Sequence, residues 1–316
     1  MKKTYKSIKK NLKRISRPVS GMLFSALGRI AMILNRQQSK RLADFLGDFT
    51  FDFLRMRRSL TEANLKQTFP EKSSAELRRI TRKIYRRQAL NIVELLRIPL
   101  IRNQSDALKM VNIETDEAFR KVLRQRQGAV VVSAHLSSWE VIGVCAGLLL
   151  SPLNIIIKPQ RNSYLNVRLN QLRTLHGNMV IAKDKALREG LYALKNSGIV
   201  VILGDQSKRH GNFYTEFLGR ESSVVLGPAF LALKAGVPLF VETCRMLDNG
   251  RYQVNINEVR TDDLNYTRED IRTLTIRYTI ILEGFIRSHP EEWLWLHDRW
   301  KKSASSNKKT RLINAQ

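Results

Sequence analysis

The sequence predicts an α/β fold, with a mixed, largely parallel central sheet flanked by helices and a helical N-terminal region before it. Two observations predict this class. After Gly128, short runs rich in β-branched residues alternate with stretches of helical spacing, the pattern of strands joined by crossover helices. Before Pro99, apolar residues recur at helical spacing. Ligands of such sheets bind outside the carboxyl ends of the strands, so we expect the functional site there.

The elements follow one another in a clear order. The helical region covers residues 39–99, with a first apolar stripe that contains Leu42, Phe45, Leu46 and Phe49. A second stripe follows Pro70 and contains Leu77, Ile80, Ile84 and Tyr85; Ser74 is placed to cap this helix, and Ile98-Pro99 ends it. Strands are expected at 129–133, 154–157, 179–182, 199–204, 239–243 and 252–259, and further helices at 187–194, 228–235 and 268–288.

The charge of the chain points to an anionic partner. Its 55 Lys and Arg residues outweigh 28 Asp and Glu residues, for a net charge of +27. Nucleic acid and an anionic membrane leaflet both offer the dense phosphates that such a chain would bind. The sequence contains no zinc-finger, RNP or helix-turn-helix signature, which ranks a nucleic-acid-binding protein low.

The positive charge is concentrated at the N-terminus, where no acidic residue precedes Asp44. An apolar stretch over 19–34 lies within this arm, is interrupted by Arg29, and is shorter than the roughly 20 residues that span a bilayer. A polybasic segment beside an apolar helix favours attachment to a membrane surface; a solvated tail beside a core helix is the alternative. We therefore divide the chain into a basic arm with an interfacial helix (1–38), a catalytic domain (39–300) and a mobile basic tail (301–316).

The cysteines and histidines do not indicate a metal site. Cys145 and Cys244 are isolated in apolar segments, as buried thiols of a reducing compartment would be. The five histidines show no ligand spacing. We expect no metal and no cofactor.

The segment Ser133–Glu140 carries the clearest chemical signal, because it places His135 directly after a buried strand. His135 and Glu140 are five residues apart, which on one continuous helix would leave them about 140° apart. They can meet only if His135 lies on the loop before a helix and Glu140 reaches back from its first turn, with Ser137 or Ser138 as the N-cap. The imidazole would then be a general base, with a carboxylate to fix its tautomer. A buried histidine with a purely structural role is the alternative.

The segment with His135 and Glu140 resembles the H-x4-[DE] motif of the lysophospholipid acyltransferase superfamily, and Trp139-Glu140 resembles its lipid A late acyltransferases, the lauroyl and myristoyl transferases. Further segments are similar to this family in the same order along the chain: Arg58–Glu71, Lys158–Asn162 with Arg173 and Gly177, Gly204-Asp205-Gln206, Phe217–Arg220 with Gly227-Pro228-Ala229, and Leu282–Lys301. Lys158 departs from the family's usual Arg, which keeps the charge but loses the bidentate geometry.

The resemblance implies a glycerolipid acyltransferase-like fold and an O-acyl transfer by a His135/Glu140 dyad. The donor would be an acyl thioester on acyl carrier protein and the acceptor a hydroxyl of a lipid A precursor or similar glycolipid, at the cytoplasmic face of the bacterial inner membrane. Arg161, Arg173 and Lys158 would bind acceptor phosphates or the developing oxyanion, and Asp205-Gln206 would order the site. An acyltransferase acting on a lysophospholipid or another membrane lipid is the alternative.

Overall fold

The computed structural model describes residues 21–22, 24–206 and 213–300, so the tail predicted over 301–316 and most of the arm predicted over 1–38 lie outside the described residues. The described residues up to 33 are helical. Next come α2 (Arg36–Phe49), the π-helical turn η1 (Thr50–Leu54), α3 (Arg58–Thr68), α4 (Ser74–Arg97), the 3-10 turn η2 (Ile98–Leu100) and α5 (Gln104–Met110). The predicted helical N-terminal region is confirmed.

A seven-stranded sheet follows, in the spatial order β1-β9-β8-β2-β5-β3-β4. It consists of β1 (Val111–Thr115), β2 (Ala129–Ser133), β3 (Leu153–Ile157), β4 (Met179–Ala182), β5 (Ile199–Leu203), β8 (Leu239–Met246) and β9 (Tyr252–Val259). Every neighbouring pair is parallel except β8 and β9. The predicted fold class, a mixed and largely parallel sheet with flanking helices, is therefore confirmed.

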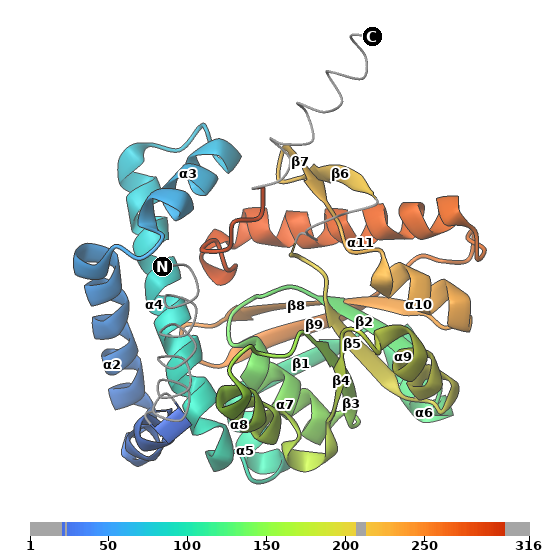
Figure 1. Cartoon of the computed structure of the whole chain (residues 1–316), viewed down its shortest axis with the longest axis horizontal. Coiled ribbons are helices and arrows are strands. Elements are labelled where there is room, and N and C mark those ends of the chain that lie inside the picture. The colour runs from blue at the N-terminus through green and yellow to red at the C-terminus, as the bar shows by residue number, and fades with distance from the viewer. Residues whose placement is uncertain (1–20, 23, 207–212, 301–316) are drawn as a thin grey trace, which may run out of the picture.

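Helices cover both faces of this sheet (Figure 1). On one face lie α9 (Ala186–Lys195), α10 (Gly227–Ala235) and α11 (Arg268–Ser288); on the other lie α5, α7 (Trp139–Leu149) and α8 (Ser163–Arg173). The remaining elements are α6 (Glu117–Gln125), the hairpin β6 (Tyr214–Phe217) and β7 (Arg220–Ser223), and the 3-10 turns η3 (Leu175–Gly177) and η4 (Pro290–Glu292). The helices α2, α3 and α4 stand along one side of the molecule.

The central strand β2 lies between β5 and β8, and all five of its residues are buried. A continuous run of small and β-branched residues is what a strand covered on both faces requires. The six strands that the sequence predicts are present, whereas β1, β6 and β7 were not predicted. The predicted cap of α4 is wrong by one residue: Ser73 is the N-cap, because Glu76 lies three residues after it and completes a capping box.

Candidate active site

The imidazole of His135 meets a carboxylate at the carboxyl ends of two neighbouring strands. Strands β2 and β5 pair in parallel with Ser133 opposite Leu203, so His135 and Asp205, each two residues past its strand, emerge side by side. His135 Nδ1 lies 2.8 Å from Asp205 Oδ1, and the Asp205 side chain is almost fully buried. The register of the sheet thus creates this contact.

A second hydrogen bond holds Asp205 in place. Trp293, in the segment after η4, donates its indole N–H to Asp205 Oδ2 at 2.8 Å. Burial pushes the pKa of Asp205 up, but His135 and the hydrogen bonds from His135 and Trp293 bring it down to about 2. Asp205 is therefore a carboxylate at neutral pH, fixed through both of its oxygens.

Asp205 also determines what His135 can do. A carboxylate only accepts hydrogen bonds, so neutral His135 carries its proton on Nδ1, and Nε2 is the acceptor nitrogen of the ring. Burial lowers the pKa of His135, but the attraction of Asp205, its hydrogen bond and the charge of Glu140 together raise it above the usual value. Gln206 Nε2 lies 3.2 Å from His135 Nε2, and the ring of Trp139 meets the imidazole edge-on. This is the arrangement of a general base whose partner favours the protonated form.

The structure does not show the predicted contact between His135 and Glu140. Both residues lie where the prediction placed them, His135 on the loop and Glu140 in the first turn of α7. The carboxylate of Glu140, however, forms a bidentate pair with Arg173 of α8, with Nε–Oε2 at 2.8 Å and Nη2–Oε1 at 2.5 Å. Asp205 lies at His135 Nδ1, the position that the prediction gave to Glu140, because it follows β5 and this strand pairs with β2.

The predicted N-cap of α7 is only partly right. Ser138 occupies the cap position but makes no capping hydrogen bond. Its hydroxyl instead contacts Tyr252 at 2.9 Å and donates to buried Glu94, while the Ser137 hydroxyl donates to Glu292. Backbone bonds add a second tie, since Leu294 N–H donates to the carbonyl of His135. The loop that carries His135 is thus held by hydrogen bonds to two buried acids, Glu94 and Glu292, and to the backbone of Leu294.

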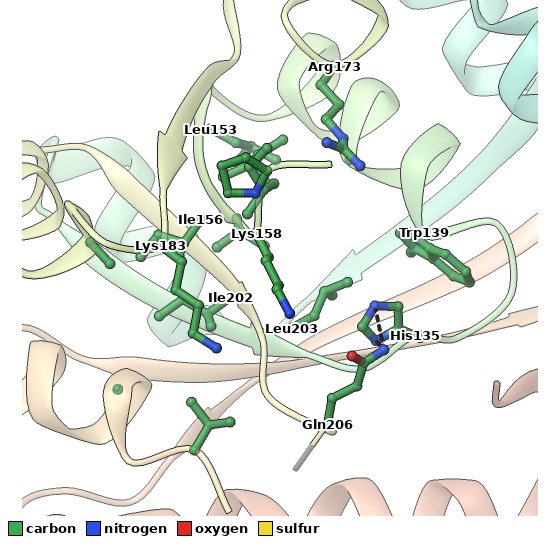
Figure 2. Close-up of a pocket in the computed structure, with 18 of the residues that line it drawn as sticks. His135, Trp139, Leu153, Ile156, Lys158, Arg173, Lys183, Ile202, Leu203 and Gln206 are labelled. Atoms are coloured by element: carbon green, nitrogen blue, oxygen red, sulfur yellow. Dashed lines mark hydrogen bonds between the residues drawn. The ribbon is translucent and has the colours of Figure 1, made fainter. Parts of the chain in front are cut away.

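His135 opens onto a cavity of about 980 Å³ with two kinds of lining (Figure 2). Near His135 the lining is polar, and the side chains of Lys158 and Lys183 extend toward the same space. Deeper parts are lined by apolar residues of β3, β5 and α10: Leu153, Ile155, Ile156, Val201, Ile202, Phe230 and Leu231. A cationic rim and an apolar interior suit an amphiphile with a phosphorylated head.

The cavity brings the residues predicted for the site together. Its lining contains His135, Glu140, Lys158, Arg161, Arg173 and Gln206, and Asp205 contacts it through His135. Arg173 is largely buried and directs two of its nitrogens to Glu140 and a third to Asn170. The roles predicted for these residues toward a substrate remain predictions.

Several residues of the site were not predicted from the sequence. Lys183 directly follows β4, so the rule that sites lie at strand ends could have found it. Trp293 and His297 come from the segment after η4, and no local pattern links them to His135. Glu242 of β8 lies below the site, accepts a hydrogen bond from Ser133, and has a pKa that burial raises to about 7. Among the described residues, no group of three or more His, Cys, Asp or Glu is placed to hold a metal ion.

The chain is similar over most of its length to known proteins. A family model described as "Bacterial lipid A biosynthesis acyltransferase" matches residues 5–302. The lipid A biosynthesis palmitoleoyltransferase of Escherichia coli K12 is 24% identical over 259 residues, which cover 81% of this chain and 82% of the relative. The lipid A biosynthesis lauroyltransferase of the same strain is 24% identical over 264 residues, which cover 83% and 84% of the two chains.

Proposed function

The chain belongs to the bacterial lipid A biosynthesis acyltransferase family, and from this we propose that it moves a fatty acyl group from an acyl carrier protein thioester to a hydroxyl of a lipid A precursor or similar glycolipid at the inner membrane. One observation carries the proposal. His135 is held by Asp205 through Nδ1, and its ring lines a cavity with a cationic rim and an apolar interior.

The proposed reaction needs one proton acceptor and no protein nucleophile. Nε2 of His135 takes the proton of the acceptor hydroxyl while its oxygen attacks the thioester carbon. Asp205 stabilises the resulting imidazolium, since a carboxylate beside a cation favours the charged form. The tetrahedral intermediate then expels the thiolate, which receives the proton from Nε2, so the products are an ester and the free thiol of the carrier. The Glu140–Arg173 pair holds α7 and α8 together beside this centre.

The cationic rim would bind the acceptor and the apolar interior the acyl chain. Lys158 and Arg161 lie in the segment between β3 and α8, and Lys183 follows β4, so all three line one side of the cavity. Ammonium and guanidinium groups bind phosphate oxygens strongly. Each methylene removed from water stabilises the complex by about 0.8 kcal/mol, so a buried acyl chain gains several kcal/mol. A membrane-lipid acceptor other than lipid A would use the same groups.

Within the part of the chain that the structure describes, no helix has the length and apolar character needed to cross a bilayer. The basic arm predicted over 1–38 supports attachment to an anionic leaflet. We therefore place the enzyme at the membrane surface, where a lipid acceptor is found.

An acyl-transfer assay tests this function. Acyl carrier protein thioesters would be offered with a panel of lipid A precursors, lysophospholipids and other membrane lipids dispersed in detergent. Wild type is expected to transfer the acyl group to a phosphorylated glycolipid, and His135→Ala to lose about 10²- to 10⁴-fold of turnover, the usual contribution of a positioned base. His289→Ala, at the end of α11 and outside the cavity lining, is the matched control and should keep full activity. Unchanged turnover in His135→Ala would overturn the proposed mechanism.

A further inference from the structure

The outer face of α2 and η1 carries a row of exposed aromatic rings. Phe45, Phe49 and Phe53 recur every four residues and are 65%, 41% and 75% exposed. Their rings stack in sequence, with centroids 6.4 Å and 5.4 Å apart. Leu54 and Met56, at the end of the row, are also exposed. We call these five residues the phenylalanine ladder. Contiguous apolar surface of this kind marks an interaction site.

The opposite face of α2 explains why the rings point outward. Ser39, Ala43 and Gly47 also recur every four residues, and all three are buried. A Cβ at Gly47 would lie 2.6 Å from the Cα of Arg86, so only glycine allows α2 to approach α4 this closely. Residues two apart on an α-helix differ by about 200° around the axis, which places Phe45 and Phe49 directly opposite this contact. The helix thus turns its small residues to the protein and its large apolar residues outward, the reverse of an ordinary surface helix.

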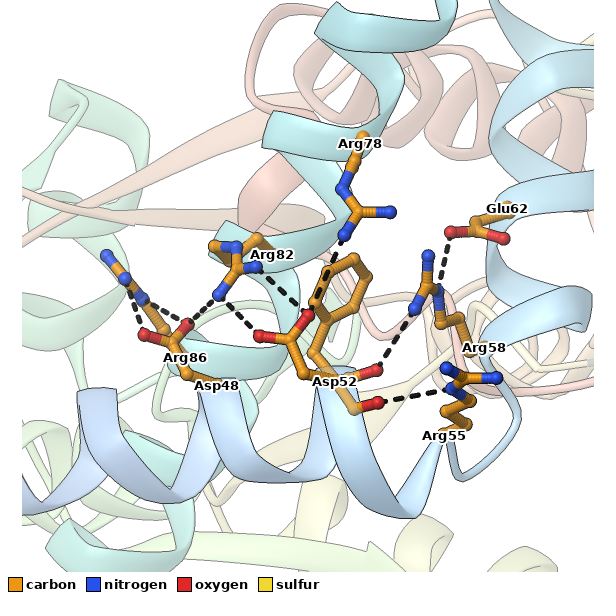
Figure 3. Close-up of polar contacts among 9 residues, drawn as sticks. Asp48, Asp52, Arg55, Arg58, Glu62, Arg78, Arg82 and Arg86 are labelled. Carbon is orange, nitrogen blue, oxygen red and sulfur yellow. Dashed lines mark hydrogen bonds and ion pairs between the residues drawn. The ribbon is translucent and has the colours of Figure 1, made fainter.

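The acidic side chains of α2 and η1 also face the protein and not the outer face. Asp48 and Asp52 reach toward α4, where Arg82 binds both of them (Figure 3). Arg86 adds a bidentate contact to Asp48, and Asp44 pairs with Lys40. The acidic groups of α2 and η1 are therefore neutralised.

Basic residues, by contrast, remain exposed at both ends of the ladder. Arg41 precedes it, and Arg55 and Arg57 lie beside Leu54 and Met56. A surface that combines exposed apolar rings with exposed guanidinium groups is complementary to an anionic lipid leaflet, which offers phosphates above an apolar layer.

The ladder is connected to the candidate active site at its far end. Arg57 Nη1 donates to the carbonyl of Leu296 at 2.7 Å, and the next residue, His297, lines the catalytic cavity. The described N-terminal helical residues lie at the other end of α2 in Figure 1. They expose Met22 and Ile33, and Gly21 lies against the Tyr164 side chain of α8. Exposed apolar residues therefore lie near both ends of α2, beside the start of α8 at one end and beside the segment that carries His297 at the other.

We propose that the outer face of α2 and η1 docks the protein on an anionic bilayer. The phenylalanine ladder enters the boundary between headgroups and acyl chains, and Arg41, Arg55 and Arg57 contact lipid phosphates. This docking extends the proposed function, because it would bring the cavity to a lipid acceptor. It can be tested without any substrate, so its failure is separate from failure of the acyl-transfer reaction.

Vesicle sedimentation tests the docking surface. The full chain would be mixed with vesicles of phosphatidylethanolamine and phosphatidylglycerol in 0.1 M and in 0.5 M salt, since high salt screens the basic arm and leaves apolar insertion. The triple variant Phe45→Ser, Phe49→Ser, Phe53→Ser should bind at least 10-fold more weakly than wild type in 0.5 M salt. The matched control changes three exposed apolar residues elsewhere, Leu108→Ser, Met179→Ser and Tyr192→Ser, and should bind like wild type. Both triples should retain transfer to a detergent-dispersed acceptor.

A site-specific probe keeps the test valid even if the triple variant folds poorly. Both native cysteines are buried, so a single Phe49→Cys or Tyr192→Cys can be labelled selectively with an environment-sensitive dye. Emission from position 49 should shift to the blue on vesicle binding and be quenched by brominated lipid, whereas position 192 should not respond. Equal vesicle binding by wild type and the triple variant, or no response at position 49, would overturn the proposal. The proposal would also be overturned if wild type sedimented as a dimer and the triple variant as a monomer while both bound vesicles equally, since the ladder would then contact a second copy.

Discussion

Two Arg–carboxylate pairs of almost identical geometry occupy different regions of this molecule. In the candidate active-site cavity, Arg173 binds Glu140 through Nε and Nη2 at 2.8 and 2.5 Å. On the helical flank, Arg86 binds Asp48 through Nε and Nη2 at 2.8 and 2.6 Å. The side chains of the first pair are 10% and 13% exposed and those of the second 41% and 30%.

The comparison teaches that burial, and not hydrogen-bond geometry, decides what such a pair does. A solvated pair contributes about 0–1 kcal/mol, because water and salt screen it. Removing one partner of a buried pair leaves an uncompensated charge and costs about 3–5 kcal/mol. Asp205 is more buried than either carboxylate of these two pairs, and its contact with His135 also raises the pKa of the imidazole.

The largest effect on turnover is expected from Asp205→Asn, which changes this most buried carboxylate. The amide can present its oxygen or its NH₂ group to Nδ1, so the tautomer is no longer fixed and the imidazolium loses its counter-charge. Turnover should fall by about 10²- to 10⁴-fold. The control is Asp184→Asn, whose carboxylate lies at the cavity wall but belongs to the segment after β4.

The pH dependence of Asp205→Asn gives a second test with a defined sign. His135 must be neutral to act as a base, and Asp205 raises its pKa, so the wild-type rate should fall on the acidic side at a pH above the ordinary histidine value of 6.5. Without the carboxylate, the largest influence left on the pKa of His135 is burial, which lowers it, and only the charge of Glu140 still raises it. In the residual activity of Asp205→Asn, the fall of kcat/KM on the acidic side should therefore occur at lower pH. An unchanged position of this fall would mean that it does not report the protonation of His135.

The buried pair itself is tested by Arg173→Ala. Glu140 would remain beside the cavity without its guanidinium partner, so the free energy of unfolding should fall by about 3–5 kcal/mol. Urea unfolding would measure the loss. The double variant Arg173→Met, Glu140→Leu should recover most of the stability because no buried charge is left, but the cavity would lose both polar groups. A loss below 1 kcal/mol in Arg173→Ala would remove the energetic distinction between the two regions.

The fold was predictable from the sequence where strands are apolar on both faces. Runs such as Ala129–Ser133 are typical of strands covered on both faces, and β9 was identified because its apolar and polar residues alternate over eight positions. The edge strand β1 alternates apolar and polar residues over only five positions, and the hairpin β6–β7 is short and polar, so neither produces a strong pattern. The antiparallel turn between β8 and β9 does carry a signal in Asn249-Gly250, which favours a hairpin.

Residues that line one cavity could be predicted from the sequence, but the hydrogen-bond partner of His135 could not. His135 was predicted from its place after a strand together with the resemblance of its segment to the H-x4-[DE] motif, and that motif also gave Glu140 as its partner. Asp205 lies 70 positions away, and only the strand order, which places β5 next to β2, makes it a neighbour. The stripe of α2 shows a similar limit, since the spacing of Phe45 and Phe49 predicts a helix but does not tell whether that face meets protein or the outside.

A smaller effect is expected from Trp293→Phe, which tests whether the buried contact between His135 and Asp205 depends on a hydrogen bond from a neutral donor. The variant leaves Asp205 Oδ2 without its donor, which costs about 1–3 kcal/mol for a buried acceptor. Turnover should fall about tenfold with little change in KM. The acidic limb should move to higher pH, opposite to Asp205→Asn, because a less stabilised carboxylate binds the imidazolium more strongly. Trp300→Phe removes an indole donor from the same aromatic cluster without touching Asp205 and should leave the profile unchanged.

The smallest effect is expected at the exposed end, from a double-mutant cycle of Asp48→Asn and Arg86→Gln. The neighbouring Arg86 and Arg82 lower the pKa of Asp48 despite its partial burial, so it is a carboxylate at neutral pH. Arg82 can replace part of the lost contact in Arg86→Gln, because it already lies 3.0 Å from Asp48. The coupling free energy from thermal unfolding should therefore be about 0.2–1 kcal/mol and should shrink as salt rises from 0.05 to 0.5 M. A salt-independent coupling of about 3 kcal/mol would mean that the Asp48–Arg86 pair is as poorly solvated as the Glu140–Arg173 pair, and exposure would no longer explain the difference between them.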